Sequence, residues 1–169
     1  QLAEGLRAKG EECIVIERDS AFAHLDTGHY ALDPQQPEQW RALLSALVGG
    51  NGAVQPYASV VHLWGLDTDL ATLGDAGQAL DVSVSSCNEL LQFLQSLDDA
   101  NVGDGLGLVL VTRGAQHLPD DKGVVQAQQR ALWGLGHTIA QEYAPCTMVD
   151  LDPDNGDGDG AALMELLTA

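Results

Sequence analysis

A tyrosine and a lysine four residues apart on one helix would allow carbonyl reduction, because the ammonium lowers the pKa of the phenol that donates the proton. The three tyrosines, Tyr30, Tyr57 and Tyr143, are followed at that distance by Pro34, Val61 and Thr147. The chain has only two lysines, Lys9 and Lys122. The pair that this chemistry requires is therefore absent from the sequence.

Serines and histidines offer no clear hydrolytic or metal site. The motif Gly-x-Ser-x-Gly does not occur, and Ser83, Ser85 and Ser86 follow one another on a predicted helix without a nearby base. We interpret these serines as hydroxyls of the helix surface or of helix packing. The five histidines lack the spacing of paired metal ligands. They are His24, His29, His62, His117 and His137, and we predict that each has a structural role with its hydrogen bonds satisfied.

An acidic run over residues 150–160 is a candidate calcium site. Its side-chain oxygens alternate as in the first half of an EF-hand loop, at Asn155, Asp157 and Asp159, and Gly160 would permit the sharp turn. The twelfth position, which should supply a bidentate carboxylate, is Leu166. We favour a flexible acidic loop and keep a calcium-binding module as the alternative.

A dinucleotide cofactor would need a glycine-rich turn between a first strand and a first helix, where backbone amides approach the pyrophosphate. The glycines of residues 103–107 precede a predicted strand, and those of residues 134–136 lie within a predicted helix. Neither group forms a phosphate cradle. Glu17 directly follows the first predicted strand, where such folds often place a ribose-binding acid. We interpret Glu17 as an ordinary exposed acid, with ribose binding as the alternative.

Helices and strands alternate along the chain and must position these residues. Hydrophobic periodicity predicts helices over residues 1–9, 37–48, 76–97 and 124–143, and buried strands over residues 13–16, 59–64, 106–112 and 147–151. It also predicts a small extended segment over residues 30–32. This order predicts an α/β fold with a truncated Rossmann-like parallel sheet and helices on both faces. We expect residues 1–169 to form a single domain whose first strand, with its turn, lies upstream of Gln1.

Two of the predicted helices carry patterns that indicate packing. The apolar side of the helix over 76–97 is predicted to face the core; its members are Leu80, Val84, Cys87, Leu91 and Leu94. Gly134 and Gly136 each cost about 1 kcal/mol relative to alanine inside a helix, which predicts that another element packs closely there. Trp133 would anchor either the core, which we favour, or an interface between subdomains.

The charge of the chain excludes several classes of partner. Seven basic residues against 25 acidic ones give a formal net charge of −18. Such a field repels phosphate backbones and anionic lipids, so we expect no binding to nucleic acids or membranes. Residues 42–112 contain no lysine or arginine but eight acids. We interpret this stretch as a solvated acidic surface, with a docking face for a basic partner as the alternative.

The cysteines and the lengths of the apolar runs predict a cytoplasmic protein. Cys13, Cys87 and Cys146 are odd in number and match no zinc or disulfide framework, so we expect them to be reduced and buried. No apolar run approaches the ~20 residues that a membrane-spanning helix needs.

Four strings in the sequence resemble, in order and spacing, the structural subdomain of the ketoreductase region in modular type I polyketide synthases. They are residues 60–67, 110–115, 126–142 and 149–153. The opening stretch through Cys13, Phe22, Tyr30 and Pro34 is also similar. The segment Glu142–Cys146 is shorter than the corresponding stretch of the family; we interpret this as a difference in a surface loop, with a degenerate module as the alternative.

The resemblance implies a non-catalytic scaffold with no catalytic, cofactor-binding or metal-binding residue of its own. It implies packing against a catalytic ketoreductase subdomain of the same polypeptide, which would bind NADPH and reduce a β-ketoacyl group on a phosphopantetheine-bearing acyl carrier protein. The parent would be a multifunctional synthase of secondary metabolites with transferase and oxidoreductase activities. The alternative is an independent NAD(P)-dependent reductase that is truncated at its N-terminus.

Overall fold

The computed structural model describes residues 2–47, 57–67, 75–102, 105–116, 126–152 and 158–168. The helices are α1 (Leu2–Ala8), α2 (Pro37–Leu47), α3 (Ala76–Asp99), α4 (Ala127–Glu142) and α5 (Asp159–Leu167), with a 3-10 helix η1 (Trp64–Asp67). The strands are β1 (Val15–Arg18), β2 (Ala23–Asp26), β3 (His29–Leu32), β4 (Ser59–His62), β5 (Gly107–Arg113) and β6 (Cys146–Leu151). The predicted alternation of helices and strands is confirmed. Several residues considered above lie outside the described ranges: Gly103, Asp104, His117, Lys122, Asn155 and Asp157.

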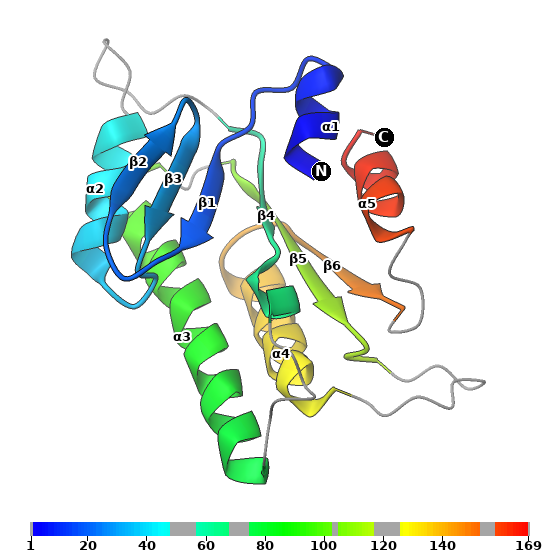
Figure 1. The fold of residues 1–169 in the computed structure, drawn as a ribbon. Coiled ribbons are helices and arrows are strands. Elements are labelled where there is room, and N and C mark those ends of the chain that lie inside the picture. The colour runs from blue at the N-terminus through cyan, green and yellow to red at the C-terminus, as the bar shows by residue number, and fades with distance from the viewer. Residues whose placement is uncertain are drawn as a thin grey trace.

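The strands form two sheets of three strands each (Figure 1). The sheet β4-β5-β6 is parallel throughout, with Val61 opposite Val109 and Val109 opposite Thr147. In the sheet β1-β3-β2, β1 and β3 are parallel while β2 is antiparallel to β3. Helices cover both faces, α1 and α5 on one and α2, α3 and α4 on the other. The predicted Rossmann-like α/β fold is therefore confirmed.

Strand β5 lies at the centre of the parallel sheet and supplies side chains to two cores. Leu108 and Leu110 join the larger core, beneath α2, α3 and α4. Val109 and Val111 point to the opposite face and pack with Leu163 of α5. Because successive side chains of a strand alternate between faces, one continuous apolar run fills both layers.

Two elements differ from the prediction. Strand β2 was not predicted, because it has only four residues and three of them are exposed. It joins β3 through a turn in which Gly28 has a φ of +68°. The end of β6 at Leu151 agrees with the predicted strand over residues 147–151, but the predicted flexible loop is wrong at its other end, because α5 begins at Asp159.

The predicted core face of α3 is confirmed at Leu94, which is buried, and at Cys87, which packs against the core, but it is wrong for the other three members. Leu80, Val84 and Leu91 are 63%, 50% and 38% exposed. The helix instead buries the face that includes Ser86, Glu89, Leu90, Phe93, Leu94 and Leu97. Glu89 can be buried because Arg18 Nη2 donates to its Oε2 over 2.6 Å. A periodicity that scores only apolar residues misses a face stabilised by such a pair.

The two glycines of α4 have different surroundings. A Cβ on Gly136 would lie 2.7 Å from Met148 Sδ and 2.9 Å from Leu110 Cδ2, so the predicted close packing is confirmed there. A Cβ on Gly134 would meet no atom within 4 Å, so the prediction is wrong at that position. Trp133 is half-buried, lies outside both cores and contacts His137 edge-on, so the favoured role as a core anchor is not confirmed.

This difference gives a matched pair of substitutions with opposite expected signs. Gly134→Ala should raise the free energy of unfolding by about 0.5–1 kcal/mol, because it adds only helix propensity. Gly136→Ala should lower it by about 1–2 kcal/mol, because the new methyl group overpacks the contact with β5 and β6. Urea unfolding followed by circular dichroism measures both. Equal effects of the two substitutions would contradict this account of α4.

Candidate functional site

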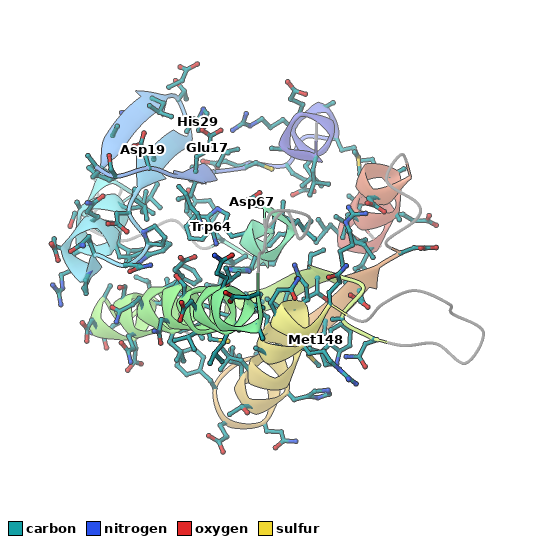
Figure 2. All side chains as sticks on the ribbon, turned by 60° about the horizontal axis from the view of Figure 1, so that its bottom comes forward. Glu17, Asp19, His29, Trp64, Asp67 and Met148 are labelled. Atoms are coloured by element: carbon teal, nitrogen blue, oxygen red, sulfur yellow. The ribbon has the colours of Figure 1, made fainter. Side chains whose placement is uncertain are left out.

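Ligands of Rossmann-like folds bind at the carboxyl ends of the parallel strands, so this edge of the sheet is the first candidate for a binding site. Arg18 ends β1, and its guanidinium reaches three groups of the same chain. Nη2 donates to Glu89 Oε2 over 2.6 Å, Nη1 lies 3.5 Å from Asp67 Oδ2, and Cζ lies 5.1 Å from the centre of the Trp64 ring. Figure 2 labels Trp64 and Asp67 between the two helical layers. The cationic group at this edge is therefore already neutralised by internal acids.

Asp150 of β6 holds the segment that follows β5. Its Oδ1 accepts hydrogen bonds from Thr112 Oγ1 over 2.7 Å and from the backbone N–H of Ala115 over 2.9 Å, and its Oδ2 accepts from the N–H of Gln116 over 2.8 Å. Thr112 and Ala115 are fully buried. The carboxylate is thus a structural acceptor whose lone pairs are directed at its own chain.

The described residues at this edge do not fit the pyrophosphate of a dinucleotide. A pyrophosphate needs free backbone amides or an unpaired cation. Here the amides of Ala115 and Gln116 are taken by Asp150, and Arg18 is paired with Glu89. The nearby carboxylate of Asp67 is 61% exposed and would repel an anion.

Glu17 lies within β1 instead of following it. Its Oε1 is 2.9 Å from Nε2 of His29 on the neighbouring strand β3, and Figure 2 shows the two residues together. The side chain of Glu17 is 57% exposed. This cross-strand pair agrees with the interpretation of Glu17 as a surface acid.

The prediction that the histidines are satisfied is wrong at two positions. Nε2 of His29 makes no hydrogen bond despite its short distance to Glu17, and His62, at the end of β4, makes none through either ring nitrogen. His62 is buried. Burial, together with the positive charge of Arg18, lowers the pKa of His62 from 6.5 to about 4. The neutral ring packs edge-on against Trp64, with ring centres 5.9 Å apart. His62 is therefore a structural residue that is sensitive to acid.

The other candidate residues have structural contacts. Ser83 Oγ donates to the carbonyl of Ala79, as expected for a helix hydroxyl. His24 stacks on Tyr30 with ring centres 4.6 Å apart, and His137 contacts Trp133. All three cysteines are free thiols. They are half-buried, whereas full burial was predicted. Burial raises the pKa of the Cys87 and Cys146 thiols, which lowers their reactivity.

The acidic run also forms structural contacts where it is described. Asp159, one of the predicted calcium ligands, is paired with Nη2 of Arg113, and Nη1 of Arg113 donates to the carbonyl of Asp152 over 3.2 Å. Within the described part of the chain, no three histidine, cysteine or acidic residues are grouped as a metal site requires. The helices that the structure describes include none long and apolar enough to cross a bilayer.

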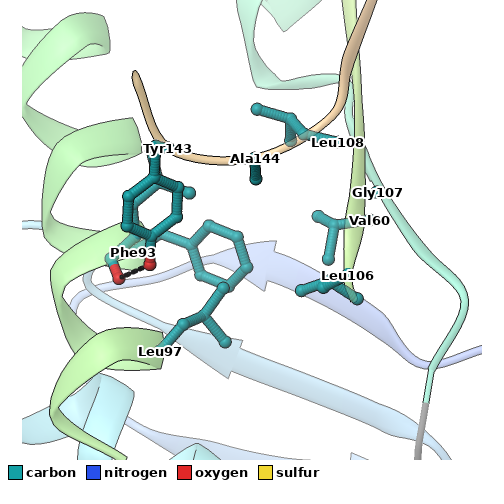
Figure 3. Close-up of a pocket in the computed structure, with 9 residues that line it drawn as sticks. Val60, Phe93, Leu97, Leu106, Gly107, Leu108, Tyr143 and Ala144 are labelled. Carbon is teal, nitrogen blue, oxygen red and sulfur yellow. Dashed lines mark hydrogen bonds between the residues drawn. The ribbon is translucent and has the colours of Figure 1, made fainter. Parts of the chain in front are cut away.

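A small apolar pocket lies between the start of β5 and the ends of α3 and α4 (Figure 3). Its volume is about 10 Å³, which is room for one water molecule and not for a cofactor or substrate. Tyr143 covers it, and its phenol donates to the carbonyl of Leu94 over 3.1 Å. The pocket is thus a packing defect beneath a tyrosine.

The exposed apolar side of α3 is not accounted for by packing within the described part of the domain. Leu80, Val84 and Leu91, which we name the α3 stripe, follow one another at steps of four and seven residues on one side of the helix. Helix α4 packs alongside α3 and carries the exposed glycine Gly134. Large apolar side chains in line on the exposed side of a helix are typical of a surface that another element covers. The sequence contained this stripe, but the periodicity of a docking face and of a core face is the same.

Comparisons with known proteins agree with the fold. Residues 14–169 match a family model described as the Rossmann-fold domain of the polyketide synthase extender module SpnB. No curated protein matches the chain. One similar solved structure contains the adenylation, ketoreductase and pseudo-Asub domains of a keto acid-selecting NRPS module (TM-score 0.78, 19% identity, 99% of this chain and 14% of that one). Another is an N-terminal ketoreductase from the macrolactin assembly line (TM-score 0.72, 12% identity, 99% of this chain and 34% of that one).

Proposed function

The chain belongs to the family of SpnB-type Rossmann-fold domains of polyketide synthase extender modules, and we propose that it is a non-catalytic scaffold in polyketide biosynthesis. In this role it packs against and stabilises the NADPH-dependent β-ketoacyl reductase subdomain of the same polypeptide. The partner holds the cofactor and acts on the substrate carried by the acyl carrier protein.

The observation that carries this proposal is the α3 stripe. Helix α3 buries one side in its own domain, through Leu90, Phe93 and Leu97, and still presents Leu80 and Val84 to solvent. Leaving a leucine in water instead of burying it forgoes about 1.5–3 kcal/mol. A surface of this kind is suited to permanent contact with another domain, in which the stripe becomes part of a shared core.

The size of the similar structures supports the identity of the partner. The chain spans 14% and 34% of the two solved chains above, so in both the same fold is one part of a longer polypeptide. Both of those proteins are described as containing a ketoreductase. A catalytic ketoreductase subdomain of the same polypeptide is therefore the occupant that we assign to the α3 stripe.

The chemistry of the described residues supports a scaffold. The sequence lacks a tyrosine–lysine pair, and the cation and amides at the carboxyl edge are held by Glu89 and Asp150. The net charge of −18 would also oppose a dinucleotide phosphate. A domain with these properties contributes surface and rigidity, and leaves the reaction to its partner.

A substitution in the α3 stripe tests the docking. We expect Leu80→Asp/Val84→Asp to weaken binding of residues 1–169 to the separately expressed catalytic subdomain by about 30- to 100-fold, because two apolar anchors are replaced by charges. Isothermal titration calorimetry measures the affinity, and circular dichroism checks that the fold is unchanged. The matched control is Leu25→Asp on β2, where the leucine is also 50% exposed. Equal affinities of the stripe variant and the control would reject the α3 stripe as the contact.

A second measurement separates the scaffold from the alternative of an independent NAD(P)-dependent reductase. The chain alone is mixed with NADPH and a β-ketoacyl thioester, and oxidation of NADPH is followed by absorbance. We expect no turnover above that of buffer, either by this chain or by its Leu80→Asp/Val84→Asp variant. Turnover by this chain alone would overturn the scaffold proposal and favour the reductase.

A further inference from the structure

The amino-terminal part of α3, residues 76–89, is attached to the domain mainly by polar side chains. Its buried residues are Ser86 and Glu89, whereas the buried residues after it include Leu90, Phe93, Leu94 and Leu97. Of the apolar side chains in the amino-terminal part, only the half-buried Cys87 packs against a core. Leu80 and Val84, its large apolar residues, are exposed. Apolar packing alone therefore does not determine which side of this part faces the domain.

Glu89 fixes the inward side through a network of hydrogen bonds. Its Oε2 accepts from Arg18 Nη2 over 2.6 Å, and its Oε1 accepts from Ser85 Oγ over 3.2 Å. The Oγ of Ser85 in turn accepts from Gln35 Nε2, before α2, over 2.9 Å. Because burying a carboxylate without a partner is strongly unfavourable, the side of α3 that carries Glu89 has to face Arg18.

The guanidinium of Arg18 is itself held in place. Its Cζ lies 5.1 Å from the centre of the Trp64 ring, and its Nη1 lies 3.5 Å from Asp67 Oδ2. Both of these residues belong to η1, and Figure 2 labels them between the strands of the upper layer and α3. Trp64 packs against Trp40 of α2, with ring centres 5.9 Å apart. The cation toward which Glu89 must point therefore has a fixed position.

Helix geometry converts the position of Glu89 into a direction for the α3 stripe. Leu80 precedes Glu89 by nine residues, which is about 2.5 turns, so the two side chains lie on opposite sides of the helix. Val84 and Leu91 lie about 140° and 160° around the axis from Glu89. A Glu89 that faces inward thus directs all three members of the stripe outward, as their exposure shows.

We propose that Arg18 and Glu89 are positioning residues for the α3 stripe. Their ion pair holds the amino-terminal part of α3 with its polar side inward, and so presents Leu80 and Val84 to the partner without belonging to the stripe. This role rests on the proposed docking function of the stripe. A buried ion pair is suited to it, because one hydrogen-bonded geometry selects one orientation of a helix that is apolar on two sides.

Hydrogen exchange of residues 1–169 alone tests how α3 is held. In Glu89→Ala, Arg18 keeps its contacts with Asp67 and Trp64, and the fold is retained. We expect the amides of residues 80–88 to exchange at least about tenfold faster than in the parent, and those of residues 94–97 to change less than about threefold, because only the amino-terminal part opens.

Two further variants serve as controls. Glu89→Gln keeps an oxygen that accepts from Arg18, so its exchange should match that of the parent. Asp99→Ala removes another acid of α3, from an exposed pair with Arg41, and should leave both parts of the helix unchanged.

Docking supplies a measurement that a merely structural role would not alter. We expect Glu89→Ala to weaken binding to the separately expressed catalytic subdomain about tenfold in isothermal titration calorimetry, although Leu80 and Val84 are retained, and Glu89→Gln to restore it.

Three results would overturn the proposal. The first is equal exchange of residues 80–88 in Glu89→Ala and the parent. The second is faster exchange in both parts of α3, since Glu89 would then stabilise the whole domain. The third is full docking affinity of Glu89→Ala. The exchange measurement needs no partner, whereas Leu80→Asp/Val84→Asp tests the docking face itself, so failure of the positioning role and failure of the proposed function are distinguishable.

Discussion

Replacing Asp150 by alanine should lower the free energy of unfolding by about 3–5 kcal/mol. The carboxylate accepts three hydrogen bonds, from Thr112 Oγ1 and from the amides of Ala115 and Gln116. Thr112 and Ala115 are fully buried, so truncation leaves donors that water cannot reach, each at a cost of about 1–3 kcal/mol. Asp150→Asn should also be destabilising, because the amide group would direct its own donors at the N–H of Ala115 or Gln116.

The control for this prediction is a carboxylate with an exposed partner. Asp99 lies 3.6 Å from Arg41, with both side chains more than 60% exposed. Asp99→Ala should therefore cost less than about 1 kcal/mol. Denaturant unfolding of the three variants at one pH gives the comparison. A loss at Asp150→Ala no larger than that at Asp99→Ala would show that the segment after β5 does not depend on this carboxylate.

The second large effect should be a contribution of His62 to the pH dependence of the free energy of unfolding. Its pKa is about 4 in the folded chain against an ordinary value of 6.5, chiefly because the ring is buried. Below about pH 6.5 the His62 ring binds a proton in the unfolded chain, whereas in the folded chain it does so only below about pH 4. The contribution of His62 to the free energy of unfolding is therefore fully present above about pH 6.5 and is lost as the pH decreases. Between about pH 7 and pH 5 the loss from this group should be about 2 kcal/mol.

His62→Leu removes the titrating ring and keeps an apolar side chain against Trp64. The stability of this variant relative to the parent should therefore increase by about 2 kcal/mol from about pH 7 to pH 5. The difference cancels the titration of the 25 acidic residues, which both proteins share. A constant difference for His62→Leu across this range would mean that the folded chain accommodates the charged ring.

The sequence predicted most elements of the fold, because buried parallel strands and amphipathic helices have strong patterns. The run of β5 and the helix over α2 are typical, and the family resemblance rested on strings that the structure places at β4, β5, α4 and β6. Strand β2 and helix α5 were missed for different reasons. Strand β2 has only four residues, three of them exposed, and its structure depends on the pairing with β3. Helix α5 has a helix-favouring sequence, but its first residues were assigned to the acidic run.

The candidate site could not be predicted because periodicity does not distinguish which side of a helix faces the core. Helix α3 has apolar residues on two sides, and the buried side is the one that contains Glu89. The pairing with Arg18, which is 71 residues distant in sequence, is what allows Glu89 to be buried on that side. The sequence also could not predict that the ring nitrogens of His62 lack hydrogen-bond partners, since the surroundings of this side chain are formed by strands and helices that are remote along the chain.

The packing of α1 against α5 also has a consequence for the order of folding. These helices contact each other across nearly the whole sequence, as the bond from Lys9 Nζ to Thr168 Oγ1 shows, and α1 itself has no buried residue. A ribosome synthesises α1 before α5 at about 5–20 residues per second, so several seconds pass between the synthesis of the two helices. Docking of α1 is thus a late step of synthesis, and a chain interrupted before α5 leaves the face of the sheet that α1 and α5 cover accessible to chaperones and proteases.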